Sequence, residues 1–156
     1  MAQDIFNLKK QVAINAVSAT NGATITSNVI DLSGYDNAIV DIAASSAAAT
    51  NVPTTLTFLE SDTTAATSFT AITQLTGGAA TSTSVGFVIP APQTATSTQV
   101  WASFNIDARK RKRYLEIQIT PITTQTFTAI VNQGRPQSLP VTASQQGVAG
   151  IVVSGI

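Results

Sequence analysis

The residues of this chain that could do chemistry are a run of cations and a few carboxylates. Five of its eight basic residues are consecutive: Arg109, Lys110, Arg111, Lys112 and Arg113. Among the acids, Asp31 and Asp36 bracket one turn, and Glu60 and Asp62 stand at the end of a predicted strand. Paired carboxylates can hydrolyse glycosides or bind calcium. A run of cations can bind phosphates or an acidic protein surface.

Catalytic chemistry is restricted because the chain contains no histidine and no cysteine. These two residue types supply the usual general base near neutral pH, the thiol nucleophile and the common ligands of transition metals. No acid pair has the spacing of a calcium-binding loop, and aspartate also serves in turns by accepting hydrogen bonds from its own backbone. The sequence therefore predicts a protein that is not an enzyme and has no cofactor and no metal site.

The basic run has three possible roles. It could contact an acidic protein partner, form a solvated or internally paired turn, or bind nucleic acid. For internal pairs, Asp107 and Glu116 are the nearest acids in the sequence. Nucleic acid is the least favoured partner, because the chain has zero formal net charge instead of the basic footprint of such proteins.

Two aromatic residues near the basic run need a separate interpretation. Trp101 and Tyr114 favour packing in the core or at an interface. An aromatic pair with loops rich in Asn and Gln is also compatible with sugar binding. A sugar-binding, lectin-like role therefore stays open.

The elements that position these residues are strands, because threonine, valine and isoleucine are abundant and apolar residues alternate. Asn21-Gly22 predicts a hairpin turn after the first strand. No segment has a convincing helical period. We expect an all-β domain over residues 11–132, built as an antiparallel β-sandwich with a jelly-roll-like arrangement. Its strands are predicted near residues 11–18, 25–30, 38–44, 54–60, 68–75, 84–90, 98–105, 113–120 and 125–132.

The alternation within three of these strands predicts which side chains share a face. In the first strand it places Val12, Ile14 and Ala16 on one face. In the last two strands it predicts that the inward side chains are Leu115, Ile117 and Ile119, and Phe127, Ala129 and Val131.

The segments outside this domain are predicted to be arms. Residues 1–10 form an N-terminal arm, and residues 133–156 form a C-terminal arm or a final strand. Their apolar contacts are expected from Phe6, Leu8, Ile151, Val152 and Val153. Only 10% of the residues are charged, so much of the surface is expected to be covered by partners.

Targeting signals are the last feature of the sequence that bears on its location. No apolar stretch reaches the ~18–20 residues of a membrane span. The first ten residues contain an acid and no apolar run of signal-peptide length. The sequence predicts synthesis in the cytoplasm and no membrane partner.

Four short motifs in order along the chain resemble a known family. They are Asp31-Leu32-Ser33-Gly34-Tyr35-Asp36, then Leu59-Glu60-Ser61-Asp62, then Arg111-Lys112-Arg113-Tyr114-Leu115, and finally Gly134-Arg135-Pro136 with Pro140-Val141-Thr142, Gly147-Val148 and Gly150. Together they resemble the head decoration, or cement, proteins of tailed phages, which are small and β-rich and are often encoded beside the major capsid protein. The similarity extends from Asp31 to Gly150.

The resemblance implies a structural virion protein on the outer capsid surface. Such a protein would be made in the host cytoplasm, bind the major capsid protein, associate with itself as a homotrimer and stabilise the capsid by bridging capsomers. The basic run would then face acidic capsid or a sister subunit, and both arms would tie subunits together. The long Thr/Ala-rich loops at residues 43–51, 61–67 and 79–84 depart from the shorter turns expected in that family. The alternative function is a receptor- or glycan-binding β-sandwich module of a phage tail or fibre.

Overall fold

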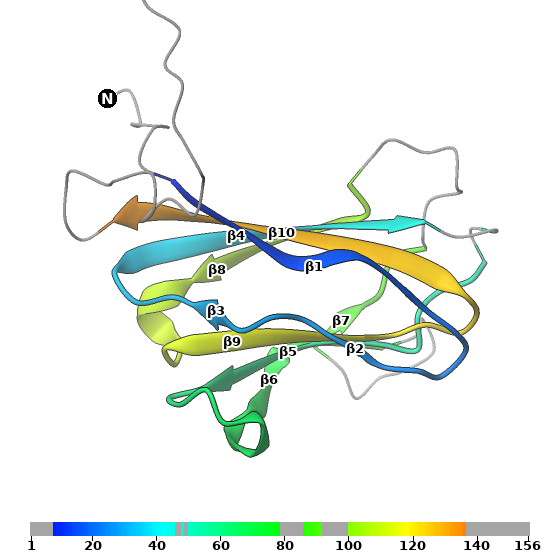
Figure 1. Cartoon of the computed structure of the whole chain (residues 1–156), viewed down its shortest axis with the longest axis horizontal. Coiled ribbons are helices and arrows are strands. Elements are labelled where there is room, and N and C mark those ends of the chain that lie inside the picture. Colours follow the sequence, from blue (N-terminus) through cyan, green and yellow to red (C-terminus); the bar gives the residue numbers. More distant parts are fainter. Residues whose placement is uncertain (1–7, 46–47, 49, 79–85, 92–99, 137–156) are drawn as a thin grey trace, which may run out of the picture.

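The computed structural model describes residues 8–45, 48, 50–78, 86–91 and 100–136. These residues form strands and two short 3-10 helices, η2 (Ala66–Ser68) and η3 (Ala108–Lys110). The strands build two sheets that pack face to face (Figure 1), which confirms the predicted all-β sandwich. Neither described helix has the length and apolar character needed to cross a membrane.

Two sheets, here called A and B, make up the sandwich. Sheet A is four-stranded and sheet B six-stranded. Neighbouring strands are antiparallel, except that β6 and β7 are parallel. In spatial order, sheet A contains β1 (Lys9–Ala19), β10 (Gln125–Pro136), β4 (Tyr35–Ser45) and β8 (Ala102–Asp107). Sheet B contains β2 (Ile25–Thr26) and β3 (Ile30–Asp31), which both pair with β9 (Tyr114–Thr120), and then β5 (Thr55–Ser61), β6 (Thr70–Gly78) and β7 (Phe87–Val88).

The order of the strands is that of a jelly roll, as predicted. Along the chain, successive strands pass from one sheet to the other, and the β5–β6 hairpin is the exception within sheet B. When β2 and β3 are counted as one interrupted strand and the two-residue β7 is set aside, eight strands remain. Eight strands connected in this alternating way form the two Greek keys of a jelly roll.

The predicted hairpin at Asn21-Gly22 is wrong. Gly22 has the expected positive φ of 74°, and its N–H donates to the carbonyl of Pro121 at 3.0 Å. However, β1 pairs with β10 in sheet A, and β2 pairs with β9 in sheet B. The turn therefore carries the chain between the sheets. Ile14 and Ile25, on either side of the turn, are both buried in the core, which a crossing between the two sheets achieves.

The core lies between the inner faces of the two sheets. As predicted, β9 contributes Leu115, Ile117 and Ile119, and β10 contributes Phe127, Ala129 and Val131, all fully buried. Trp101 is also in the core, as favoured from the sequence. Its ring lies 5.8 Å from that of Phe127 between centroids, and its Nε1–H donates to the carbonyl of Pro90 at 3.1 Å. Trp101 is therefore not available as a surface platform for a ligand.

The described sandwich is longer than the predicted domain at both ends. β1 begins at Lys9, inside the predicted N-terminal arm, and β10 continues through Gly134 to Pro136, beyond the predicted boundary at residue 132. Gly134 and Pro136 pair with Asn37 and Tyr35 of β4. Pairing with the long strand β4 overrides the weak strand preference of glycine and proline.

Two buried glutamines fix β10 to neighbouring connections. The Gln125 Nε2 donates to the carbonyl of Asn51 at 2.8 Å, and the Gln133 Nε2 donates to the carbonyl of Asp31 at 2.7 Å. Both side chains are almost fully buried. A buried amide that lacks a partner is unfavourable, so these bonds select the positions of the two connections.

Replacement of Gln133 by alanine is expected to destabilise the fold by about 1–3 kcal/mol, because a buried hydrogen bond is lost and a cavity remains. The matched control is Gln118→Ala on β9, whose side chain is partly exposed and should change stability by less than about 0.5 kcal/mol. Urea unfolding of the two variants measures the difference. Equal losses would show that Gln133 has no special role.

Candidate interaction surfaces

The basic run forms the connection between β8 and β9. Asp107 ends β8, and its carboxylate accepts a hydrogen bond from the backbone N–H of Arg109 at 3.2 Å, at the start of η3. Arg111 to Arg113 then lead into β9. The cations therefore lie in a connection, where consecutive side chains are not forced to alternate between two faces as they are in a strand.

Each cation of the run lies within 4.0 Å of a carboxylate. The pairs are Arg109 Nε–Asp107 Oδ1 at 2.9 Å, Lys110 Nζ–Asp107 Oδ2 at 3.8 Å, Arg111 Nη1–Glu60 Oε2 at 3.7 Å, Lys112 Nζ–Asp62 Oδ2 at 4.0 Å and Arg113 Nη2–Asp31 Oδ2 at 2.9 Å. We call these nine residues the basic corner. Five cations and four carboxylates leave only one unit of positive charge, so the corner is not a strongly cationic surface.

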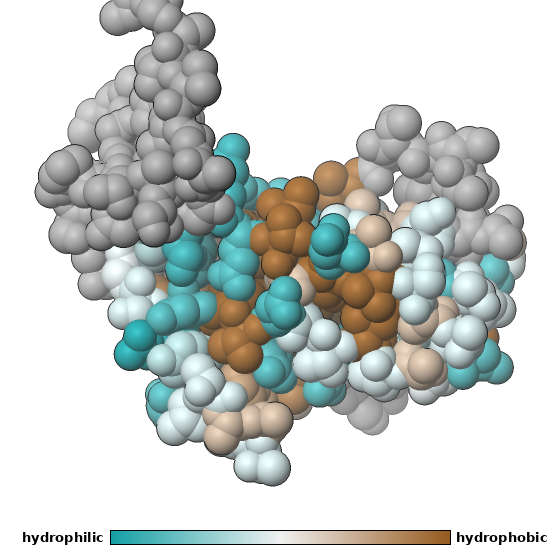
Figure 2. Space-filling view, viewed as in Figure 1, coloured by the Kyte–Doolittle hydropathy of each residue, from teal (hydrophilic) through white to brown (hydrophobic). Residues whose placement is uncertain are grey.

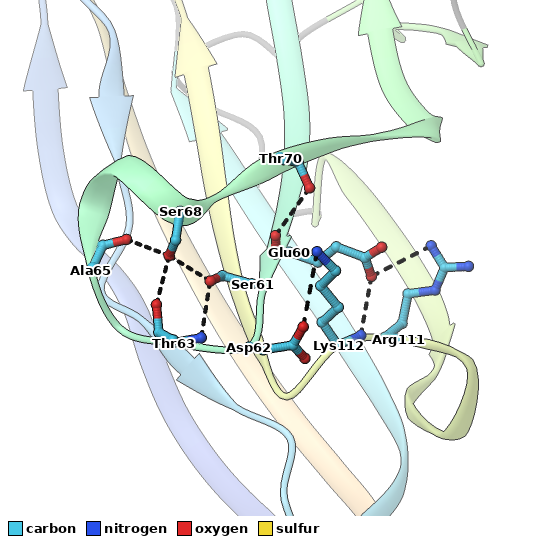
Figure 3. Close-up of polar contacts among 9 residues, drawn as sticks. All are labelled: Glu60, Ser61, Asp62, Thr63, Ala65, Ser68, Thr70, Arg111 and Lys112. Carbon is cyan, nitrogen blue, oxygen red and sulfur yellow. Dashed lines mark hydrogen bonds and ion pairs between the residues drawn. The ribbon is translucent and has the colours of Figure 1, made fainter.

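The end of β5 and the turn that follows it position two of the acids, Glu60 and Asp62 (Figure 3). The Ser61 Oγ accepts a hydrogen bond from the backbone N–H of Thr63 at 3.0 Å and lies 2.6 Å from the Ser68 Oγ. The Glu60 carboxylate also accepts the backbone N–H of Lys112 at 3.2 Å. The hydrogen bonds of these hydroxyl groups hold the turn, and Glu60 and Asp62 face the connection that carries the basic run.

Asp31 is held by two kinds of hydrogen bond. Its Oδ1 accepts the backbone N–H of Ser33 at 2.9 Å, as expected for a turn aspartate, and the Nε of Arg113 at 3.1 Å. The guanidinium of Arg113 binds both carboxylate oxygens and lies over the Tyr114 ring, 4.9 Å from its centroid. The hydrogen bond from Arg113 holds the pKa of Asp31 below its ordinary value, although partial burial opposes the shift.

The second acid with a lowered pKa is Asp107. Its side chain receives hydrogen bonds from Arg109 Nε and Nη2 at 2.9 and 3.1 Å, which lower the pKa of Asp107 and raise that of Arg109. Both groups are solvent-exposed, so this pair contributes little to stability. The Asp107–Arg109 pair orders η3. It leaves Lys110 as the most exposed cation of the corner, with 77% of its side chain exposed.

The sequence identified only part of this pairing. Asp107 was one of the two predicted partners and is confirmed. Glu116, the other, forms no ion pair in the described part of the chain. It is 8% exposed on β9, and burial raises its pKa. Asp31, Glu60 and Asp62 were missed as partners because they are distant in sequence, although all three lie in the motifs that resemble the decoration proteins.

Three of those motifs meet at the basic corner. Asp31 comes from the first motif, Glu60 and Asp62 from the second, and Arg111 to Arg113 from the third. The fourth motif begins beside the first, since Pro136 pairs with Tyr35. Its remaining residues, 140–150, lie outside the described residues. The described parts of the four motifs therefore lie close to one another at one end of the sandwich.

Of the five predicted arm contacts, only Leu8 is among the described residues. The others, Phe6, Ile151, Val152 and Val153, lie outside them. Leu8 is half-buried, and a Cβ at Gly134 would lie 3.2 Å from its Cδ2. Leu8 thus packs near β10 of its own chain, whatever further contact it makes.

The outer face of sheet A is a second candidate surface. Val12, Ile39 and Ile130 are 48%, 37% and 42% exposed, and Val12 lies opposite Ile130 in the pairing of β1 with β10. Asp41 on the same sheet accepts hydrogen bonds from the Ser103 Oγ and the Asn132 Nδ2 at 2.6 and 3.4 Å. In the view of Figure 2 sheet A lies above sheet B, so the hydrophobic residues seen across the middle lie between the two sheets, and the outer face of sheet A is turned upward. This face offers aliphatic contacts with satisfied polar groups between them.

Two hollows lie beside the end of β8. One has a volume of about 340 Å³ and is lined by Asp36, Asn37, Asn105, Ile106, Asp107 and Arg109. The other has a volume of about 180 Å³ and is lined by Ile72, Gln74, Leu75, Asn105, Ile106, Asp107, Lys110 and Arg111. Neither contains Trp101 or Tyr114. Among the described residues, no group of three or more acids could hold a metal ion.

Comparison with known proteins adds no relative. The chain matches no protein-family model, and no curated protein sequence matches it. The resemblance to the decoration proteins therefore rests on the four sequence motifs alone.

The Asp31–Arg113 pair predicts a pH dependence of stability. Because the folded-state pKa of Asp31 is lowered, its stabilising effect is complete above the ordinary pKa of the carboxyl group and is lost as the pH falls through the lowered value. We expect Asp31→Asn to reduce the urea midpoint at about pH 7 and to have a smaller effect at about pH 2. The control Asp62→Asn, at a side chain that is 74% exposed, should change the midpoint less. A loss with Asp31→Asn that is the same at both pH values would contradict the pairing.

Glu116 predicts the opposite dependence. Burial raises its folded-state pKa, so its contribution to stability is complete below the unfolded-state pKa and is lost as the pH rises through the raised value. Glu116→Gln should therefore stabilise the fold at about pH 8 and leave it nearly unchanged at about pH 3. Thermal unfolding at the two pH values measures this difference in stability. If Glu116→Gln gives no gain in stability at the higher pH, the carboxylate of Glu116 is not destabilised by burial.

Proposed function

We propose that this chain is a structural virion protein that decorates the outer surface of a capsid and stabilises it by bridging capsomers. Its partners would be the major capsid protein and further copies of itself. In this role it needs no catalytic residues. Binding would use many weak contacts, which gain strength from repetition on a symmetric lattice.

The meeting of three resemblance motifs at the basic corner carries this proposal. Motifs scattered at random would have no reason to supply the acids and the cations of one ion-pair network. Here Asp31, Glu60 and Asp62 face cations of the third motif. The jelly roll also suits the proposal, because viral capsid proteins use it, although a fold by itself does not establish a function.

The surfaces suit a protein that binds other proteins. The outer face of sheet A presents aliphatic side chains, and the basic corner is a charged rim with little net charge. Interfaces commonly combine an apolar centre with a polar rim that fixes the register of the partners. Nucleic acid is a weaker partner, because every cation of the run already faces a carboxylate.

One observation favours a second candidate, the receptor- or glycan-binding module. The larger hollow beside β8 has carboxylate, amide and guanidinium groups, which can hydrogen-bond sugar hydroxyls, and its volume of about 340 Å³ can hold a small saccharide. This site differs from the one predicted, because Trp101 is buried. A glycan array without a hit would remove this candidate.

The decisive measurement is the copy number of the chain in purified virions, which the proposal requires the source phage to produce. Quantitative mass spectrometry should give a ratio to the major capsid protein that approaches one to one. A handful of copies would place the protein at a vertex or tail and favour receptor binding. Absence from the particle would refute both virion roles.

The docking role of the basic corner has a sharper test than removal of all five cations, because Arg111 and Arg113 also pair with acids of other strands. Lys110 is 77% exposed and shares Asp107 with Arg109. We expect Lys110→Glu to weaken binding to capsids that lack the protein by on the order of threefold at low salt, and less at high salt. The control is Lys10→Glu, an exposed cation of β1 outside the corner. Equal effects of the two variants would exclude the corner as the docking site.

A further inference from the structure

The pairing of β5 with β6 is interrupted by a wide bulge. The register shifts between Thr57 and Leu59 of β5. At this point β5 has the single residue Phe58 between two paired positions, whereas β6 has residues 72–75. The longer strand therefore leaves the regular ladder for part of its course. Bulges are common beside functional sites, where they redirect side chains.

The bulge is a packed part of the fold. The Thr76 Oγ1 donates a hydrogen bond to the carbonyl of Ile72 at 3.0 Å, and the Gly86 N–H donates to the carbonyl of Thr76 at 2.8 Å. A Cβ at Gly86 would overlap the carbonyl oxygens of Thr73 and Gln74, so glycine is required where this connection lies against the bulge. These contacts hold the bulge in one conformation.

The bulge turns two aliphatic side chains toward β8. Ile72 and Leu75 both line the smaller of the two hollows, together with Ile106 of β8. In a regular strand, residues three positions apart point to opposite faces, so the bulge is what lets both side chains face one hollow. Ile72 and Ile106 are each 3% exposed, and Leu75 is half-buried. The hollow therefore has an apolar floor, to which both sheets contribute.

The rim of the same hollow carries cations. Lys110 and Arg111 line it, and so does Asp107. The Asp107 carboxylate accepts hydrogen bonds from Arg109 at 2.9 and 3.1 Å, whereas the Lys110 Nζ lies 3.8 Å from it, too far for a hydrogen bond. Arg111 is paired with Glu60 at 3.7 Å (Figure 3). Lys110, with 77% of its side chain exposed, is therefore the cation that can meet a carboxylate of a partner.

The size of the hollow favours a side chain over a small-molecule ligand. Its volume is about 180 Å³, whereas sites for drug-sized ligands have volumes of about 300–1,000 Å³. An apolar floor beside an exposed cation fits one aliphatic side chain with a carboxylate next to it. Residues 137–156 of the chain itself contain no acidic side chain, so a partner protein supplies this combination better.

We propose that the bulge of β6, the end of β8 and Lys110 form a pocket for one aliphatic side chain of a partner protein, whose neighbouring acidic residue contacts Lys110. The proposal deepens and rests on the proposed function, in which this partner is the major capsid protein. The aliphatic side chain anchors the contact, and the carboxylate fixes its register, as the apolar centre and charged rim of protein interfaces do.

Peptides with blocked ends test the pocket in solution. The probe is Thr-Glu-Leu-Glu-Thr, titrated into the intact, nitrogen-15-labelled chain and followed by NMR. We expect amide shifts at Leu75, Asn105 and Lys110. Replacement of both glutamates of the peptide by glutamine should weaken binding by about threefold, and replacement of its leucine by serine should abolish it. Shifts confined to other residues, or equal binding of the three peptides, would overturn the pocket.

Variants of the chain separate the roles of charge and cavity. Lys110→Gln should bind the glutamate and glutamine peptides equally. The matched control is Lys112→Gln, because Lys112 belongs to the same corner but does not line the hollow. It should keep the preference for glutamate. Gln74→Trp, at an exposed residue of the bulge, should fill the hollow and prevent binding. The pocket is refuted if Lys110→Gln keeps the preference or if Gln74→Trp binds as the intact chain does.

A shortened chain tests whether the protein fills its own pocket. Residues 8–136 contain all the described strands. If this shortened chain binds the peptide and the intact chain does not, a segment of the chain itself occupies the pocket and the partner is refuted. Equal binding by both chains supports a partner.

The peptide measurements need no capsids, so the two proposals can fail separately. If the peptide does not bind while the protein is abundant in virions, only the pocket is refuted. If the peptide binds at the pocket but the protein is absent from virions, the pocket stands and the proposed function fails.

Discussion

At one end of the sandwich, the arrangement of the connections depends on a single constraint, which is the repulsion among five adjacent cations. In water such charges tolerate one another, but a compact fold brings them together beside packed strands. The structure resolves the repulsion with carboxylates from the end of β3, from the β5–β6 turn and from the end of β8. Connections that are remote in the sequence are thereby held together. The same ion pairs reduce the charge that the corner can offer to a partner.

The strands and most of the core could be predicted because their signals are local. Alternation in β9 and β10 assigned the inner faces correctly, and Trp101 was correctly favoured for packing. In β1 the prediction placed Val12 and Ile14 on one face, but Val12 is exposed and Ile14 is buried. Register shifts between these residues break the alternation, and no residue type in the sequence indicates where such shifts occur.

The missed features depend on contacts between distant segments. The turn at Asn21-Gly22 has the predicted φ, yet turn chemistry does not decide which strand each flank will pair with. The partners of Arg111 and Arg113 lie on other strands, and only the sandwich brings them near. For the candidate site, the sequence therefore predicted the cations and one of their four acids. The resemblance motifs contained the other three without indicating that they pair.

The central position of β10 has a consequence for folding during synthesis of the protein. β1 and β4 do not pair with each other, and both pair with β10, which lies more than a hundred residues after β1. During synthesis sheet A cannot assemble until nearly the whole chain has left the ribosome. Folds dominated by such distant pairings form slowly, in milliseconds to seconds. Until then β1 has no partner strand and β4 lacks its neighbour on one side, so the low charge that suits the finished surface leaves the nascent chain exposed to aggregation.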